Sequence, residues 1–122
     1  WRIGLQHPRK RDEYVRIFEL TDCAVATSGD YERFFVHEGV RYAHIIDART
    51  GWPVGNGVES ATVLAPTATQ ADALSTSIFV LGAEEGLELI RGYGGVSAMI
   101  ITADPGDPLG AVFHCTPDLA EE

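Results

Sequence analysis

Residues 58–82 read VESATVLAPTATQADALSTSIFVLG, and the hydrophobic period changes within this stretch at Pro66. The segment before the proline is rich in small and β-branched residues, which is typical of a strand. After the proline, apolar residues recur at the spacing of one helix face, so we expect a helix over residues 67–81. Thr67 or Thr69 would cap its start, and the glycine that follows would end it. A strand that leads directly into a long helix indicates a mixed fold.

The flanking segments are shorter and punctuated by turn residues. Strands are expected at residues 13–20, 22–27, 31–36, 40–47, 96–102 and 110–115. The short strand at residues 22–27 is made of small residues and should be buried. His37-Glu38-Gly39 would close a hairpin, and residues 83–91 begin with acids and end in arginine as a second helix would. We therefore predict an α+β fold, a mostly antiparallel sheet with a helix pair packed on one face. The domain would span residues 1–116, and residues 117–122 would form an acidic, frayed tail.

The bulk composition is that of one globular domain. The chain has 122 residues, of which 45% are hydrophobic and 22% charged, and its formal net charge is −9. An acidic protein of this kind lacks the basic face that nucleic-acid binding needs. No apolar run reaches the roughly 18 residues of a membrane-spanning helix, so no span is expected. Cys23 and Cys115 lie far apart in sequence, and we expect two buried free thiols.

The first residues, WRIGLQHPRKRDEY, lack the apolar region of a signal peptide. Trp1, Ile3 and Leu5 already alternate as in a strand. We therefore expect the chain to be an incomplete, C-terminal portion of something longer.

Two oxygen-bearing side chains, Asp72 and Thr76, lie one turn apart on the expected helix, opposite its stripe of Leu74, Ile78 and Leu81. A carboxylate and a hydroxyl at this spacing suit a hard cation such as Mg²⁺. Such an ion needs about six oxygens, so phosphate, water or other protein groups would complete its shell. The alternative is that Asp72 simply hydrogen-bonds to the helix start or to a neighbouring strand.

Residues 44–53 read HIIDARTGWP, a strand end followed at once by a turn. Strand alternation places His44 and Asp47 on opposite faces. In one interpretation His44 is a general base beside a substrate, while Asp47 orients the turn or lies near a metal. In the other, His44 is half-buried and bonded to the backbone, and Asp47 caps the turn. The local sequence leaves both interpretations open.

A third candidate is the turn Thr27-Ser28-Gly29-Asp30-Tyr31. It is similar to the entry of a nucleophile elbow, but the G-x-S-x-G frame is absent because Ala26 and Asp30 replace the glycines. One interpretation is a tight turn that offers backbone N–H groups and the Ser28 hydroxyl to a ligand. The other is an ordinary serine or Asx turn.

Taken in order, three segments resemble the C-terminal half of the ApbE family, the bacterial FAD:protein FMN transferases. The segments are ATSGDYERFF (residues 26–35), HIIDARTGWPV (44–54) and APTATQADALSTSIFVLG (65–82). The leading W-x-I-G-L and the later G-V-S-A agree with the family, so the resemblance covers residues 1–101.

The resemblance implies an enzyme that uses Mg²⁺ to cleave FAD. Family members transfer the FMN moiety to a Thr or Ser hydroxyl of an acceptor protein and release AMP. Some relatives mainly hydrolyse FAD to FMN and AMP, so an FAD pyrophosphatase is the alternative activity. The implied partners are FAD and a flavin-acceptor protein, and a homodimer is compatible with the family.

Site residues follow from the matched motifs. The resemblance implies that Asp72 and Thr76 are Mg²⁺ ligands and that His44 is the base for the incoming hydroxyl. The residues implied in binding FAD are Ser28, Ile45 and Asp47.

The chain departs from the family in two ways. Ala48 stands where the family usually has proline after the aspartate, which loosens the turn. The family's N-terminal half, which supplies another metal ligand and much of the FAD pocket, is not in these residues. A non-catalytic flavin-binding or interaction fragment is therefore a further hypothesis. Many family members are exported and lipid-anchored, and the sequence leaves the location of this protein open.

Overall fold

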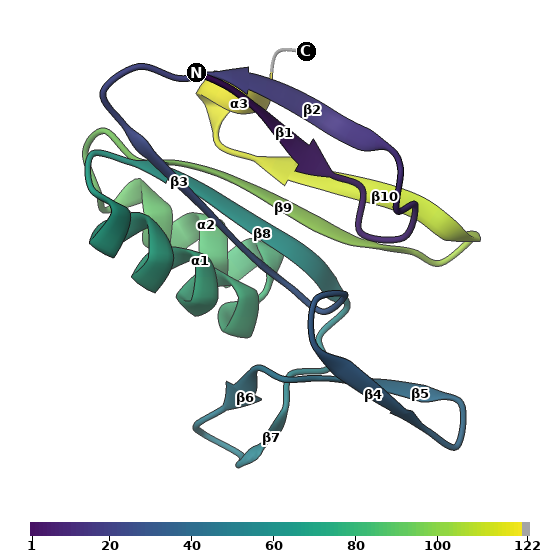
Figure 1. Cartoon of the computed structure of the whole chain (residues 1–122). Coiled ribbons are helices and arrows are strands. Elements are labelled where there is room, and N and C mark those ends of the chain that lie inside the picture. The colour runs from purple at the N-terminus through teal and green to yellow at the C-terminus, as the bar shows by residue number, and fades with distance from the viewer. Residues whose placement is uncertain (121–122) are drawn as a thin grey trace.

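The computed structural model describes residues 1–120 as strands and helices arranged in layers (Figure 1). The strands are β1 (Arg2–Gln6), β2 (Tyr14–Glu19), β3 (Ala24–Gly29), β4 (Phe34–His37), β5 (Val40–Ala43), β6 (Ile46–Asp47), β7 (Trp52–Pro53), β8 (Val58–Ala65), β9 (Ser97–Asp104) and β10 (Asp107–Cys115). The helices are α1 (Ala68–Leu81), α2 (Ala83–Arg91) and α3 (Pro117–Ala120).

The central sheet has the strand order β10-β9-β8-β3, and every neighbouring pair is antiparallel. Helices α1 and α2 cover one face, and the β1–β2 ribbon lies on the other side (Figure 1). Strand β8 is buried along almost its whole length because both of its faces are covered. The predicted α+β class, with its helix pair on one face of an antiparallel sheet, is confirmed.

The two faces of the sheet hold separate apolar clusters. Between the sheet and the helices lie Val63, Ile78, Phe79, Ile90 and Ile100 with their neighbours. On the other face, Leu5, Phe18, Met99, Ile101 and Leu119 pack together. Burying each large side chain of this kind contributes about 1.5–3 kcal/mol, so the helix-side cluster fixes α1 against the sheet.

Helix α1 begins where the sequence predicts. The Thr67 hydroxyl accepts a hydrogen bond from the Gln70 amide at 3.2 Å, so Thr67 is the cap and Thr69 is not. Gly82 ends the helix in a left-handed conformation, with φ of 90°. The caps set where α1 begins and ends, and the apolar cluster sets which of its side chains face the sheet.

Hairpin β4–β5 projects from the end of the sheet (Figure 1). Glu38 and Gly39 at its tip have φ of 51° and 78°, as a two-residue turn between antiparallel strands requires. Phe35 and Tyr42 stack across the hairpin at 5.0 Å between ring centroids. The predicted hairpin is therefore confirmed.

The expected strand over residues 40–47 is wrong as a single element. Strand β5 ends at Ala43, and the chain bends through His44 and Ile45 before β6 begins. The bend arises because the Ile45 carbonyl accepts from Val54 at 2.9 Å, which draws this segment toward β7. This bend brings His44 to the end of the sheet.

Three other expectations are corrected. The tail is not frayed over residues 117–120, because α3 packs Leu119 into the second cluster with 8% of its surface exposed. Residues 121–122 lie outside the described part, and the domain division at residue 116 stays a prediction. Cys23 is exposed and Cys115 only half-buried, although both thiols are free. Strand β3 is half-buried rather than buried, because it lies at the sheet edge.

Gly86 permits the close approach of α2 to α1. A Cβ at this buried position would lie 3.0 Å from Ile78 Cβ and 3.1 Å from Ile100 Cδ1. We expect Gly86→Val to lower the free energy of unfolding by about 1–3 kcal/mol, since the core must shift to admit the side chain. Urea denaturation measures this loss. Gly94→Val is the matched control because a Cβ there meets nothing within 4 Å; equal midpoints for the two variants would contradict close packing at Gly86.

Candidate active site

A cavity of about 580 Å³ lies between α1, the end of β3 and the bend that follows β5. Its lining residues are Thr27, Ser28, Gly29, Glu32, Arg33, His44, Ile45, Ile46, Asp72 and Thr76. The three motifs that were identified separately in the sequence thus meet at one place. Of the six predicted site residues, the structure brings five together in this cavity, and Asp47 is the exception.

Helix α1 supplies the acidic side of the cavity. Leu74 and Ile78 are buried against the sheet, so Asp72 and Thr76 on the opposite side of the helix are exposed. Both side chains line the cavity, one turn apart. The helix therefore presents a carboxylate and a hydroxyl to the same space.

His44 lies in the bend across from the helix, and its side chain is exposed. Its backbone N–H and its Nδ1 both contact the Arg33 carbonyl oxygen, at 3.0 Å and 3.1 Å. A carbonyl oxygen can only accept, so Nδ1 carries the hydrogen. In the neutral ring, Nε2 is then the unprotonated nitrogen and can accept a proton. The ring is bonded to the backbone, as one interpretation of His44 expected, but it is exposed rather than half-buried, and it lines the cavity.

Ile45 and Ile46 have different environments. Ile45 is 8% exposed because it packs into the cluster between helices and sheet, and so it anchors the bend. Ile46 is 51% exposed and offers more apolar surface at the cavity wall. Sequence reasoning selected Ile45 and missed Ile46, because alternation alone does not say which face is covered.

Asp47 is engaged in the turn. Its carboxylate accepts from the Arg49 amide at 2.9 Å and from the Arg49 guanidinium at 3.0 Å and 2.9 Å. Hydrogen bonds from Arg49 hold the pKa of Asp47 below its ordinary value. Its backbone carbonyl also accepts from the amides of Thr50 and Gly51. Asp47 thus stabilises the turn and lines a neighbouring groove, not the His44 cavity.

The Ser28 hydroxyl connects β3 to α1. It lies 3.1 Å from Ser75 Oγ and 3.1 Å from Thr76 Oγ1. Ser75 is fully buried, and its Oγ donates to the Asp72 carbonyl at 3.0 Å. Sequence reasoning missed Ser75, although a polar residue between Leu74 and Ile78 on the buried side of a helix is a detectable signal.

A largely buried charge cluster of Arg9, Asp30 and Glu59, in which Glu59 is the most buried, supports the turn after β3. Arg9 binds both carboxylate oxygens of Asp30 at 2.7 Å and contacts Glu59 at 2.9 Å. Burial raises the pKa of Glu59, and the positive charge of Arg9 opposes this effect. The cluster ties the N-terminal segment to the turn that holds Ser28. No local pattern in the sequence indicates it, because its members are 21 to 50 positions apart.

The donors in the cavity fit Mg²⁺ better than zinc. Within residues 1–120, no group of three or more His, Cys, Asp or Glu side chains could hold a metal ion. One carboxylate and one hydroxyl on a helix are too few for a closed site. Mg²⁺, however, is commonly held by one or two carboxylates and completed by water and substrate phosphates. Asp72 and Thr76 therefore fit as part of a magnesium shell.

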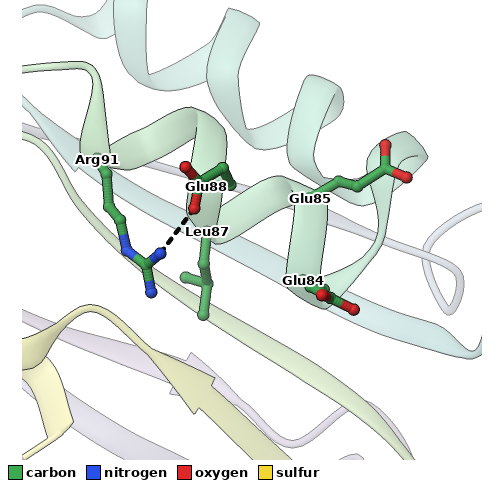
Figure 2. Close-up of a pocket in the computed structure, with 5 residues that line it drawn as sticks. All are labelled: Glu84, Glu85, Leu87, Glu88 and Arg91. Atoms are coloured by element: carbon green, nitrogen blue, oxygen red, sulfur yellow. Dashed lines mark hydrogen bonds and ion pairs between the residues drawn. The ribbon is translucent and has the colours of Figure 1, made fainter.

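Two other hollows adjoin the helices. Figure 2 shows the first, of about 720 Å³, on the surface of α2, lined by Glu84, Glu85, Leu87, Glu88 and Arg91. Glu88 and Arg91 pair there at 2.7 Å, and these exposed charges form the solvated face of one helix. The second hollow, of about 650 Å³, is largely apolar and meets the His44 cavity at Ile46 and Thr76. Among the described helices, none is long and apolar enough to cross a membrane.

Comparison with known proteins gives consistent matches. The model of the ApbE family matches residues 1–100. An FAD:protein FMN transferase of Treponema pallidum is 45% identical over 105 residues, which are 85% of this chain and 29% of that protein. One from Vibrio cholerae is 42% identical over 107 residues, covering 87% of this chain and 32% of its own.

A solved structure agrees with these matches. The crystal structure of an ApbE protein from Thermotoga maritima superposes with a TM-score of 0.81 at 39% identity, over 97% of this chain and 36% of that one. The chain therefore spans about a third of the length of the proteins that it matches.

Proposed function

This chain belongs to the ApbE family, and from that premise we propose that it provides the metal-binding helix and the catalytic base of an FAD:protein FMN transferase. The observation that carries the proposal is the meeting of Ser28, His44, Asp72 and Thr76 in one cavity. These residues come from three separate motifs, and among them His44 offers a base while Asp72 and Thr76 offer oxygen ligands for a metal, as phosphoryl-group transfer requires.

The reaction joins the FMN phosphorus of FAD to the hydroxyl oxygen of a Thr or Ser on an acceptor protein. The bond that breaks links that phosphorus to the oxygen shared with the AMP phosphate, and AMP leaves. Asp72 and Thr76 would hold Mg²⁺ at the diphosphate. When bound, the ion supplies positive charge against the negative charge of the transferring group.

His44 is the proposed general base. The Nδ1–H bond to the Arg33 carbonyl holds the ring in one tautomer, with Nε2 free to take the proton of the attacking hydroxyl. The same carbonyl stabilises the imidazolium that forms, because it accepts from Nδ1–H in both protonation states. The polar side chains of the cavity suit the diphosphate, while Ile46, and to a smaller extent the buried Ile45, supply the apolar surface that a flavin ring needs.

A second candidate activity uses water in place of the acceptor hydroxyl. The exposed position of His44 favours this alternative, because water reaches the base directly. The products would be FMN and AMP, so the protein would be an FAD pyrophosphatase.

The test incubates the intact protein with FAD, Mg²⁺ and a candidate acceptor protein from the same organism. We expect intact-mass spectrometry to find an FMN-sized adduct on the acceptor, with one AMP released per adduct and none in EDTA. Equal amounts of free FMN and AMP without an acceptor would indicate the pyrophosphatase. Flavin binding without AMP release would contradict both activities and favour the non-catalytic hypothesis.

A further inference from the structure

We propose that Ser28 and Ser75 are positioning residues that direct the lone pairs of Thr76 toward the metal. This inference rests on the proposed function, since it concerns how one of the two metal-binding side chains is oriented. The three hydroxyls form a chain from the cavity into the protein, running from Thr76 to Ser28, then to Ser75, and ending at the Asp72 carbonyl.

The direction of donation along these hydrogen bonds follows from the number of hydrogens that the hydroxyls have. Each hydroxyl has one hydrogen to donate. Ser75 donates its hydrogen to the Asp72 carbonyl, at 3.0 Å. Ser28 must therefore donate to Ser75, and Thr76 must donate to Ser28, both over 3.1 Å. Thr76 thus uses its hydrogen within the protein, and its lone pairs are left for the cavity.

A neutral hydroxyl can bind a metal only through a lone pair, so its hydrogen has to point elsewhere. If Ser28 instead donated to Thr76, that bond would compete with the metal for the same oxygen. A bound cation also makes the Thr76 hydroxyl a stronger donor, which strengthens its bond to Ser28. The hydrogen bonds to the serines and a bound metal therefore favour the same orientation of the Thr76 hydroxyl.

Another hydroxyl on helix α1, that of Ser77, can be compared with that of Thr76. Ser and Thr within helices commonly bond back to the carbonyl four residues earlier, and Ser77 does so to Ala73 at 2.7 Å. The equivalent carbonyl for Thr76 is that of Asp72, and Ser75 already donates to it. Ser75 therefore occupies the acceptor that would otherwise turn Thr76 away from the cavity.

Both serines lie where such a role requires. Ser75 is fully buried on the sheet side of α1, so its hydroxyl cannot be satisfied by bulk water. Ser28 is half-buried on β3, on the strand that packs against α1. Strand and helix are thus joined at the point where the metal is proposed to bind.

The experiment measures binding of Mn²⁺, a spectroscopic substitute for Mg²⁺, to the intact protein by electron paramagnetic resonance titration. We expect Ser75→Ala and Ser28→Ala each to raise the Kd for Mn²⁺ by about 10- to 100-fold, the usual effect of losing a group that orients a metal ligand. Ser28→Thr keeps the hydroxyl and should restore binding. Ser77→Ala, which removes a hydroxyl from the same helix, should change the Kd less than about threefold.

Turnover provides a second readout that a loss of stability would not produce. In Ser75→Ala, whose serine lies outside the cavity lining, the Mg²⁺ concentration for half-maximal rate should rise, while the rate at saturating Mg²⁺ stays close to that of the unmodified protein. If Ser28→Ala and Ser75→Ala bind Mn²⁺ as Ser77→Ala does, while Asp72→Ala loses binding, the positioning role is overturned and the proposed function stands. If Asp72→Ala also binds normally, the metal site and the proposed function fail together.

Discussion

His44→Ala is expected to lower the rate of FMN transfer by about 10²- to 10⁴-fold, the range that a general base contributes. The physical reason is the loss of Nε2, the nitrogen left unprotonated by the bond from Nδ1 to the Arg33 carbonyl. Binding of FAD should change much less, because His44 acts on the acceptor hydroxyl. Single-turnover rates of adduct formation, with FAD affinity measured separately, check both parts.

Two further variants distinguish loss of the base at His44 from loss of structure. His44→Asn keeps an amide donor near the place of Nδ1 but has no base at Nε2, so it should fold normally and remain as inactive as the alanine variant. His37→Ala removes an exposed histidine at the tip of the β4–β5 hairpin, outside the cavity, and should retain activity. Full activity in His44→Asn would contradict the role of Nε2.

Asp72→Ala is expected to reduce turnover at a fixed Mg²⁺ concentration by about 10³-fold, since metal stabilisation of the developing charge is worth several kcal/mol. Asp72 is the carboxylate that α1 presents to the cavity, and the exposed side chain can be removed without disturbing the core. Rates measured across a Mg²⁺ titration, together with circular dichroism of the variant, distinguish a lost metal from a lost fold.

The control for Asp72→Ala is Glu84→Ala, which removes an exposed carboxylate from α2. It should leave the Mg²⁺ dependence unchanged, because overall negative charge is not what holds the ion. Asp72→Asn keeps an oxygen ligand without its charge and should fall between the alanine variant and the unmodified protein. An unchanged Mg²⁺ dependence in Asp72→Ala would remove α1 from the metal site.

The sequence predicts local features of the site well. Asp72 and Thr76 share a helix face because their spacing is one helical turn, and Thr67, the observed cap, is one of the two threonines that the sequence offers after Pro66. His44 and Asp47 also have different surroundings, since His44 lines the cavity whereas Asp47 binds Arg49 and lines a neighbouring hollow. Each of these relations depends only on neighbours within a few positions.

The features that the sequence predicted wrongly or missed depend instead on contacts between segments that are distant in sequence. The bend at His44 depends on bonds to Arg33 and to Val54, which are up to eleven positions away. Leu119 makes residues 117–120 part of the fold only because a second apolar cluster exists on the far face of the sheet. The contacts of Arg9 with Asp30 and Glu59 likewise join distant segments. Periodicity within a window cannot reveal such partners.

What the sequence determined by itself is the class of fold, the helix that carries Asp72 and Thr76 on one face, and the three motifs whose residues are proposed to carry the chemistry. Hydrophobic periodicity and helix capping depend on residues that are close in sequence, so the sequence alone reveals them. Only the tertiary structure decided which of those residues meet, that Nδ1 of His44 faces the Arg33 carbonyl, and that the Ser28 hydroxyl lies against those of Ser75 and Thr76. The reason is that a hydrogen bond between segments exists only once both segments have been packed, and its direction depends on every partner in the chain of donors.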